Sequence, residues 1–256
     1  MSTSKTTYTN STNSPSSNLS IIDVKTKNIR FGFSSELFLG TSSDPTVNVI
    51  ERPNLSPVID LTLKREDKQD VSIIDSVPFD VLLKMGLLSN QVSFLDVEKQ
   101  IIYFDLPISY GGHLELNHLA KLHLTISNIN PEIVSTVETI KSTKKTNLVF
   151  DYKSKNITST SSRVLNVKDD LMFLFDKSKI TNIVSTSVKG VSTSFDAEKI
   201  RLSNIKDLYF NPLLNNALLN PKIDYLLLNN SSVSTKELDC KIDSDTVVYS
   251  LTYKKI

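Results

Sequence analysis

The C-terminal stretch of the chain, residues 222–256, reads KIDYLLLNNSSVSTKELDCKIDSDTVVYSLTYKKI. Residues 238–242 and 247–253 place an apolar side chain at every second position, with mostly charged or hydroxyl side chains between them. This period of two is typical of a β-strand with one buried face and one face in water. The apolar run 223–228 comes first, and turn-forming Asn, Ser and Asp residues separate the three segments. We therefore predict three successive strands, the last embedded in a sheet because chain ends fray unless they are paired.

Short runs of the same kind fill most of the chain. They recur at a spacing of about ten residues, which favours a β-sandwich or barrel over strands alternating with long helices. Residues 132–140 fit either a strand or a short helix. The other predicted strands, starting where the folded part begins at residue 19, lie at residues 19–24, 29–33, 36–39, 46–50, 58–63, 71–74, 91–97, 100–106, 112–117, 121–126, 148–152, 164–167, 171–175, 180–188, 199–202 and 207–210.

Two short helices interrupt these strands at corresponding places in the two halves. One is predicted at 78–88, beginning at Pro78, and the other between Pro212 and Pro221, because proline is favoured at a first helical position. The polar, basic segment 141–146 separates the halves. We predict an all-β chain with two barrels and short flanking helices, divided into an extended polar arm (1–18), a first barrel (19–144) and a second barrel (145–256).

The first 18 residues are dominated by Ser, Thr and Asn and contain no apolar stripe. Such a segment cannot bury enough apolar area to offset the entropy that ordering would cost. Two alternatives follow, a disordered tail or an arm that docks on a neighbour. For the second, we expect backbone pairing with the exposed strand edge of another chain, since strand addition needs few apolar side chains.

Composition argues against several classes of protein. The formal net charge is +1 over 256 residues, so a basic surface for nucleic acid is not expected. The chain has no run of 18 apolar residues and no apolar leader at its start, which predicts synthesis in a cytoplasm without membrane insertion. A single cysteine, Cys240, excludes an internal disulfide, and its place between Leu238 and Ile242 predicts a small buried side chain.

Three segments together resemble a known family. They are 222–228 followed by 238–244, then 247–253, which are similar in order to the family's closing strands, and 114–126, which is similar to the end of its first barrel. The family is the double jelly-roll major capsid proteins of small icosahedral membrane-containing phages, of the corticovirus type and the similar flavobacterial single-stranded DNA phages.

The resemblance implies two jelly-roll domains and a structural role in a virion, without catalysis. Three copies would form a homotrimeric capsomer with a six-sided outline, and capsomers would tile an icosahedral shell. The implied partners are further copies of the chain and neighbouring capsomers, with a vertex protein and an internal viral membrane beyond them, and no sequence-specific nucleic acid. The long polar arm departs from the pattern, so a minor vertex or spike role stays open.

The three histidines, His113, His118 and His123, lie within one short segment, and Glu115 is close to the first. Clustered histidines are common metal ligands. In a strand, however, residues 113 and 123 share one face and residue 118 points to the other. The pattern therefore favours solvated histidines on an edge strand over a metal site.

Carboxylates gather at two expected turns, Asp169-Asp170 and Asp243-Ser244-Asp245. They could bind Ca²⁺ between capsomers, but turn residues of this kind more often cap backbone N–H groups. The sequence contains no nucleophile elbow, phosphate-binding glycine loop or zinc-protease motif. We predict no catalytic, cofactor-binding or metal-binding residues, no cofactor and no enzymatic activity.

The alternative function is a receptor- or carbohydrate-binding β-sandwich of a spike, a vertex or an adhesin. Such modules usually present aromatic side chains on loops. The candidates in this chain are Tyr110, Tyr209 and Phe210. A β-sandwich hydrolase is disfavoured because no acid–base constellation is visible.

Overall fold

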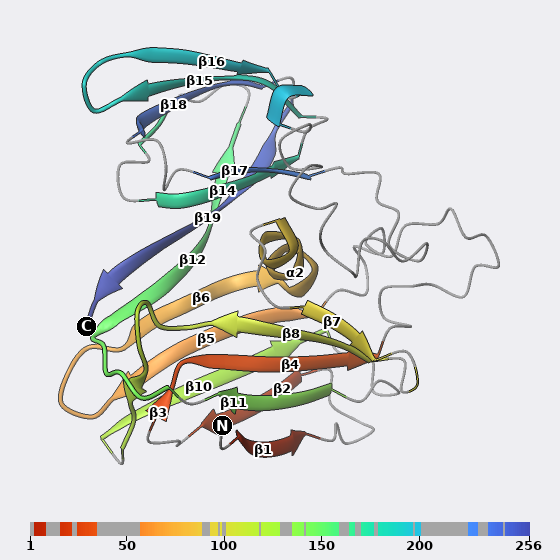
Figure 1. The fold of residues 1–256 in the computed structure, drawn as a ribbon, viewed down its shortest axis with the longest axis vertical. Helices are drawn as coiled ribbons and strands as arrows, with labels where there is room; N and C mark the ends of the chain where they lie inside the picture. Colours follow the sequence, from red (N-terminus) through yellow and green to blue (C-terminus); the bar gives the residue numbers. More distant parts are fainter. Residues whose placement is uncertain are drawn as a thin grey trace.

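The protein is almost entirely β-structure, arranged as two stacked barrels in a computed structural model (Figure 1). The structure describes residues 3–8, 16–21, 25–34, 57–88, 93–96, 98, 101–117, 119–128, 135–140, 142–158, 164–166, 170–176, 179–196, 198–200, 225–229, 235–242 and 244–256.

The first barrel consists of two facing sheets that enclose one apolar core. One sheet has the strand order β1-β11-β4-β8-β7, and the other contributes β6-β5-β10-β2. Inward residues of both, such as Phe31, Phe104 and Leu61, are fully buried against one another. The strands are β1 (Thr3–Tyr8), β2 (Ser16–Ile21), β4 (Asn28–Ser34), β5 (Val58–Arg65), β6 (Val71–Pro78), β7 (Ser93–Asp96), β8 (Ile101–Pro107), β10 (Ala120–Ser127) and β11 (Ser135–Ile140). The short strands β3 (Lys25–Thr26) and β9 (Leu114–Glu115) pair beside them.

The second barrel is built in the same way from the later part of the chain. A sheet of order β17-β14-β19-β12 faces a sheet of order β13-β18-β15-β16, and a separate apolar core lies between them. The strands are β12 (Leu148–Ile157), β13 (Val164–Asn166), β14 (Asp170–Asp176), β15 (Ile180–Ser187), β16 (Ser192–Asp196), β17 (Tyr225–Asn229), β18 (Thr235–Ile242) and β19 (Thr246–Lys255).

Strand pairing in the second barrel is nested. β12 pairs with β19, β13 with β18, β14 with β17 and β15 with β16, all antiparallel. The first barrel repeats the scheme with β4 against β11, β5 against β10 and β7 against β8. A long antiparallel hairpin rolled into a barrel gives this pattern, which is that of a jelly roll. The prediction of an all-β chain with two jelly rolls is confirmed.

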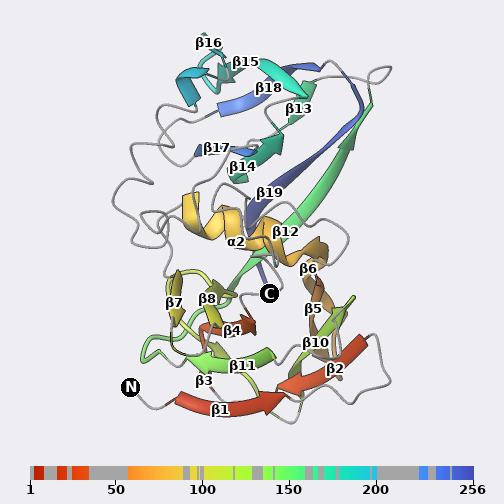
Figure 2. The same cartoon turned by 90° about the vertical axis from the view of Figure 1, so that its right-hand side faces the viewer.

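One sheet runs through both barrels. β12 of the second barrel lies parallel to β6 of the first, with Tyr152 opposite Ile74, and this contact joins two four-stranded halves into one sheet of eight strands. The helix α2 (Phe79–Leu88) follows β6 directly and lies between the barrels in both views (Figure 2). The two barrels are thus connected by a shared sheet and by a helix packed between them.

Most described strands fall where the sequence predicts them. The three closing strands appear as β17, β18 and β19, and β19 is paired on both sides, with β12 and β14. The helix predicted at 78–88 is α2, and the ambiguous segment 132–140 contains the strand β11. The strands predicted at 36–39, 46–50 and 207–210, and the helix between Pro212 and Pro221, lie outside the described residues.

One local prediction in the second barrel is wrong, and one strand there was not predicted. The strand predicted at 199–202 begins instead in a helical turn over 198–200, because the carboxylate of Asp196 accepts a hydrogen bond from the Lys199 amide at 2.7 Å and caps that turn. Strand β16 was not predicted, since its sequence STSFD has no alternating apolar pattern. Its pairing with β15 forms it.

The N-terminal segment also differs from the expected arm. β1 pairs with β11 from Thr3↔Ile140 to Tyr8↔Ser135, and β2 pairs with β10 from Ile21↔Leu122 to Ser16↔Ser127. Both described strands therefore extend sheets of their own chain, where a neighbour's strand edge was expected. The segment does add strands to open sheet edges, as expected, but these edges belong to β11 and β10 of its own first barrel. The exact domain limits 19–144 and 145–256 stay a prediction.

Helix α2 fits against β8 only because residue 86 is glycine. A Cβ atom at Gly86 would lie 2.1 Å from Cε2 of Phe104, whose ring is buried and meets Phe79 edge to face at 6.1 Å. Gly86→Ala gains about 1 kcal/mol of helix propensity, yet overpacking of this kind typically costs about 1–3 kcal/mol. We expect a net loss of stability and a lower melting temperature by calorimetry. Adding Phe104→Leu to Gly86→Ala should recover part of the loss, and a single variant that melts above the parent would contradict the packing argument.

Candidate functional site at the junction of the barrels

Charged side chains tie three strands of the shared sheet together. The carboxylate of Asp151 on β12 is almost fully buried and accepts ion pairs from Lys153 at 2.6 Å and from Lys254 at 3.1 Å. Lys254, on β19, also donates to the backbone carbonyl of Ser72 on β6. One lysine therefore reaches from the second barrel across β12 to the first.

A buried tyrosine makes a second link. The ring of Tyr152 on β12 belongs to the core of the first barrel, and its hydroxyl donates to the carbonyl of Pro107 at 2.8 Å. Complete burial raises the pKa of Tyr152, so the phenol stays protonated and keeps donating. Leu174, Leu227 and Leu251 of the second barrel join the same apolar cluster, which makes the boundary between the barrels a continuous core.

Backbone hydrogen bonds fasten the loop after β8 to the segment that leads into β12. The Tyr110 amide donates to the Leu148 carbonyl at 3.0 Å, and the Phe150 amide donates to the Ile108 carbonyl at 3.1 Å. Ser109 Oγ donates to the Gly112 carbonyl at 2.6 Å and holds the loop closed. The linker between the barrels is therefore bound to the first barrel along its length from residue 144 to residue 150.

Aromatic rings continue from this junction to the surface. The rings of Tyr110 and Tyr253 stack with centroids 5.1 Å apart and planes 9° apart, and Phe150 meets Tyr110 edge to face at 5.7 Å. The two tyrosines are exposed by 46% and 44%. Exposed apolar residues that touch one another form a patch, and tyrosine is enriched at protein interfaces. Of the aromatic candidates from the sequence, Tyr110 lies here, and Tyr209 and Phe210 lie outside the described residues.

The expected histidine arrangement is wrong for two of the three residues. His113 was expected to be solvated and is buried, and His123 is half-buried on β10, which is an inner strand between β5 and β2. His118 lies outside the described residues.

Glu115 pairs with Lys145, which lowers the pKa of this carboxyl below its ordinary value. The described part of the chain holds no group of three or more His, Cys, Asp or Glu residues that could bind a metal ion.

The predicted carboxylate turns are only partly described. Asp170 opens β14 opposite Thr252, and Asp245 precedes β19, while Asp169 and Asp243 lie outside the described residues. Cys240 is confirmed as a buried side chain, 2% exposed, on the inner face of β18. Burial and the neighbouring charge of Asp239 raise the pKa of the Cys240 thiol to about 12. A thiol that is protonated and buried is unsuited to nucleophilic catalysis.

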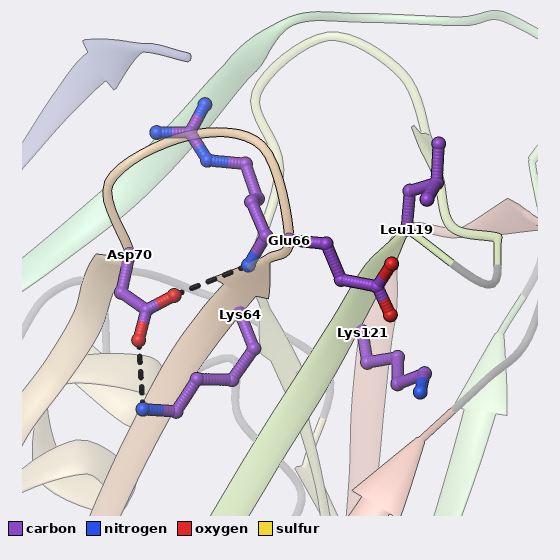
Figure 3. A pocket seen from close by; sticks show the side chains of 6 residues that line it. Lys64, Glu66, Asp70, Leu119 and Lys121 are labelled. Carbon is purple, nitrogen blue, oxygen red and sulfur yellow. Dashed lines mark hydrogen bonds and ion pairs between the residues drawn. The ribbon is translucent and has the colours of Figure 1, made fainter.

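A shallow hollow of about 230 Å³ lies at the turn between β5 and β6 (Figure 3). Both carboxylate oxygens of Asp70 are engaged there, one by Lys64 Nζ at 2.7 Å and the other by the Arg65 amide at 3.1 Å. The ion pair with Lys64 lowers the pKa of Asp70. These contacts join residues of the turn to one another, so the charged groups of the hollow serve to hold the β5–β6 hairpin.

The comparison with solved structures gives a match over nearly the whole chain. The crystal structure of the STIV MCP, a major capsid protein, aligns with a TM-score of 0.59 and 13% identity, covering 98% of this chain and 95% of that one. The chain has the fold of that protein. PBCV-1 VP54, fitted into a reconstruction of the virophage Sputnik, aligns with a TM-score of 0.46 and 7% identity, covering 98% and 93%.

Sequence comparisons give no further relation. No family model matches the chain, and no curated protein matches it. The double jelly-roll fold implied by the resemblance is thus confirmed, while its corticovirus-type features stay a prediction. Among the described residues, no helix has the length and apolar character needed to cross a membrane.

The junction itself could not be identified from the sequence. Asp151, Lys254 and Ser72 lie on three separate strands, and nothing in their local sequence indicates that they meet. The one residue in the sequence that pointed to this surface was Tyr110, a candidate for an exposed aromatic side chain on a loop. Its partner Tyr253 falls in an alternating strand pattern and so reads as an ordinary strand residue.

Removing the Tyr152 hydroxyl tests the link between the barrels. Tyr152→Phe keeps the ring in the core but leaves the Pro107 carbonyl without this donor, which should cost about 1 kcal/mol. For a chain of this size, that corresponds to a melting temperature lower by about 2–4 °C. The matched control is Tyr253→Phe, since Tyr253 is 44% exposed and loss of its hydroxyl should be nearly neutral. Equal shifts for both variants would refute a special role for the buried bond.

Thiol labelling tests the position of Cys240. With the pKa raised to about 12, the native protein at pH 8 should present about a thousandfold less thiolate than an ordinary cysteine. Maleimide should therefore react slowly with the native chain, with a rate that still rises above pH 9, and rapidly after unfolding in urea. Rapid labelling of the native chain would show that β18 does not bury this residue.

Proposed function

We propose that the chain is a structural capsid protein that forms the shell of an icosahedral virion. The observation that carries the proposal is the pair of nested jelly rolls joined through one eight-stranded sheet. This arrangement aligns with a major capsid protein over nearly the full length of both chains. A shell subunit must keep a fixed shape under load from its neighbours. The shared core and the Lys254 links between the barrels supply that rigidity.

The proposed assembly is a homotrimer with a nearly six-sided outline. Each chain contributes two similar barrels, so three chains around a three-fold axis place six barrels in a ring. A formal net charge of +1 opposes such self-association little, since copies of the chain carry almost no mutual repulsion. The proposed partners are further copies, neighbouring capsomers, a vertex protein and an internal membrane, and the proposed location is the virion after synthesis in a host cytoplasm.

A second candidate function is favoured by one observation, the exposed stack of Tyr110 on Tyr253. Flat aromatic faces at a surface are the usual contact for sugar rings and for peptide side chains. A receptor- or carbohydrate-binding role at a spike or vertex would use this patch. In a shell protein, the same patch would instead be covered by a neighbouring copy.

Mass and imaging separate the two functions. We expect native mass spectrometry of the purified chain at micromolar concentration to give three times the 28.6 kDa of one chain, and electron microscopy to show six-sided particles or sheets. A chain that stays monomeric, forms no particle and binds glycans would overturn the shell proposal. That outcome is assigned to the patch if Tyr253→Ala abolishes glycan binding while Leu119→Ala, an exposed apolar residue elsewhere, leaves it unchanged.

A further inference from the structure

The loop between β15 and β16 exposes two valines. Val188 and Val191 are 58% and 63% exposed, the highest fractions among the large apolar side chains of the described residues. Hairpin loops are usually built from Gly, Asn, Asp and Ser, which accept the backbone of a turn at low cost. Valine has no such preference for turns, and its apolar side chain is disfavoured in water. Local folding therefore does not explain two valines at this place.

Hydrogen bonds hold the loop in one shape. The Gly190 amide donates to the Ser187 carbonyl at 2.9 Å, and Gly190 itself has a left-handed φ of 78°. The Ser187 amide donates to the Val191 carbonyl at 2.8 Å, and the Val191 amide donates to Ser187 Oγ at 3.1 Å. A preorganised loop loses little entropy when it binds a partner. We call residues 187–191 the valine tip.

The place of the valine tip in the fold suits a contact between barrels of different chains. Strands β15 and β16 lie at the end of the second barrel that is farther from the first barrel (Figure 1, Figure 2). In the proposed ring, first and second barrels alternate, so this end of each second barrel faces the first barrel of the next chain. A cyclic ring is built from heterologous interfaces, in which two different surfaces of the chain meet. The inference thus rests on the proposed trimer.

The second surface is the stack of Tyr110 on Tyr253. Tyr110 belongs to the loop after β8 of the first barrel, and both rings are about half exposed. In the described part of the chain, the other large exposed apolar side chains, Leu119 and Val164, lie on separate elements. Tyrosine rings offer flat apolar faces to aliphatic side chains. The same faces attract cations, and the exposed Lys189 lies between the two valines of the tip.

We propose that the valine tip of one chain packs on the Tyr110–Tyr253 stack of a second copy, the next chain in the ring. The contact removes two exposed apolar patches from water at once, which favours association. Repeated three times around the axis, it closes the ring, because each chain supplies one tip and one stack. The stack is then the acceptor of a neighbouring copy.

Threonine substitutions test the contribution of the valine tip in the full chain. Val188→Thr combined with Val191→Thr keeps the branched shape, adds hydroxyl groups and should hardly affect folding at exposed positions. We expect the dissociation constant of the trimer, from native mass spectrometry over a range of concentrations, to rise at least about tenfold. The matched control is Val164→Thr on β13, which is 48% exposed and should leave association unchanged.

The two levels of the proposal fail in different ways. A double threonine variant that forms trimers as tightly as the parent chain would overturn the contact and leave the capsid proposal standing. A parent chain that is only monomeric would overturn both. An equal loss of association in the Val164→Thr control would also overturn the contact, since the effect would then not belong to the tip.

Cross-linking tests which surfaces meet. Lys189→Cys places a thiol on the valine tip, and Lys255→Cys places one two residues after Tyr253 on the same side of β19, with both patches kept. A chain with both substitutions should be joined by a short bismaleimide into species of two and three chains. Each single variant should give none, and Lys189→Cys with Lys68→Cys, at the exposed β5–β6 turn, is the matched control.

The native Cys240 does not interfere, because it is buried. Linked chains in a single variant would show that like surfaces meet and would overturn the tip-to-stack contact. Equal linking in the Lys68→Cys control, or no linking in a double variant that still forms trimers, would overturn it as well.

Discussion

The pairing of β12 with β19 is the constraint on which the rest of the molecule depends. Ten consecutive residue pairs, from Leu148↔Lys255 to Ile157↔Thr246, hold the two strands together. β12 then presents its other edge to β6, and β19 presents its other edge to β14. Without this pair, neither the second barrel nor the connection to the first would exist. The buried Asp151 adds ion pairs to Lys153 on β12 and to Lys254 on β19.

The junction combines forces of different range. Apolar contact through Tyr152 and Leu251 is short-ranged and resists separation of the barrels. The ion pair of Lys254 with Asp151 is partly exposed on its lysine side and is therefore weakened by salt, as surface pairs generally are. The backbone bonds between residues 108–113 and 144–150 add direction, since they set the angle at which the linker leaves the first barrel. Rigidity and orientation at this joint thus come from separate sets of atoms.

Local patterns in the sequence predicted the strands but could not predict their partners. The alternation at Leu238, Cys240 and Ile242 reports a buried face directly, and the structure buries all three. Pro78 indicated where α2 begins to within one residue, because the structure ends β6 at Pro78 and begins the helix at Phe79. By contrast, β1 lies in the predicted polar arm and exists because β11 offers an open edge, which is a feature of the tertiary structure. The strand predicted from residue 19 appears as β2, which begins at Ser16 and pairs along β10. β16 and the burial of His113 were missed for the same reason.

The order of strands also bears on how the chain is made. A ribosome delivers β12 long before β19, and between them it delivers every other strand of the second barrel. The first barrel has its nested partners β4 and β11 available once residue 140 has emerged, whereas the second cannot close until β19 follows. During that interval β12 has no β19 beside it and exposes a strand edge, which is a template for pairing between nascent chains. Slow translation of residues 148–256 would lengthen the period in which this edge is open to neighbouring polypeptides on one message.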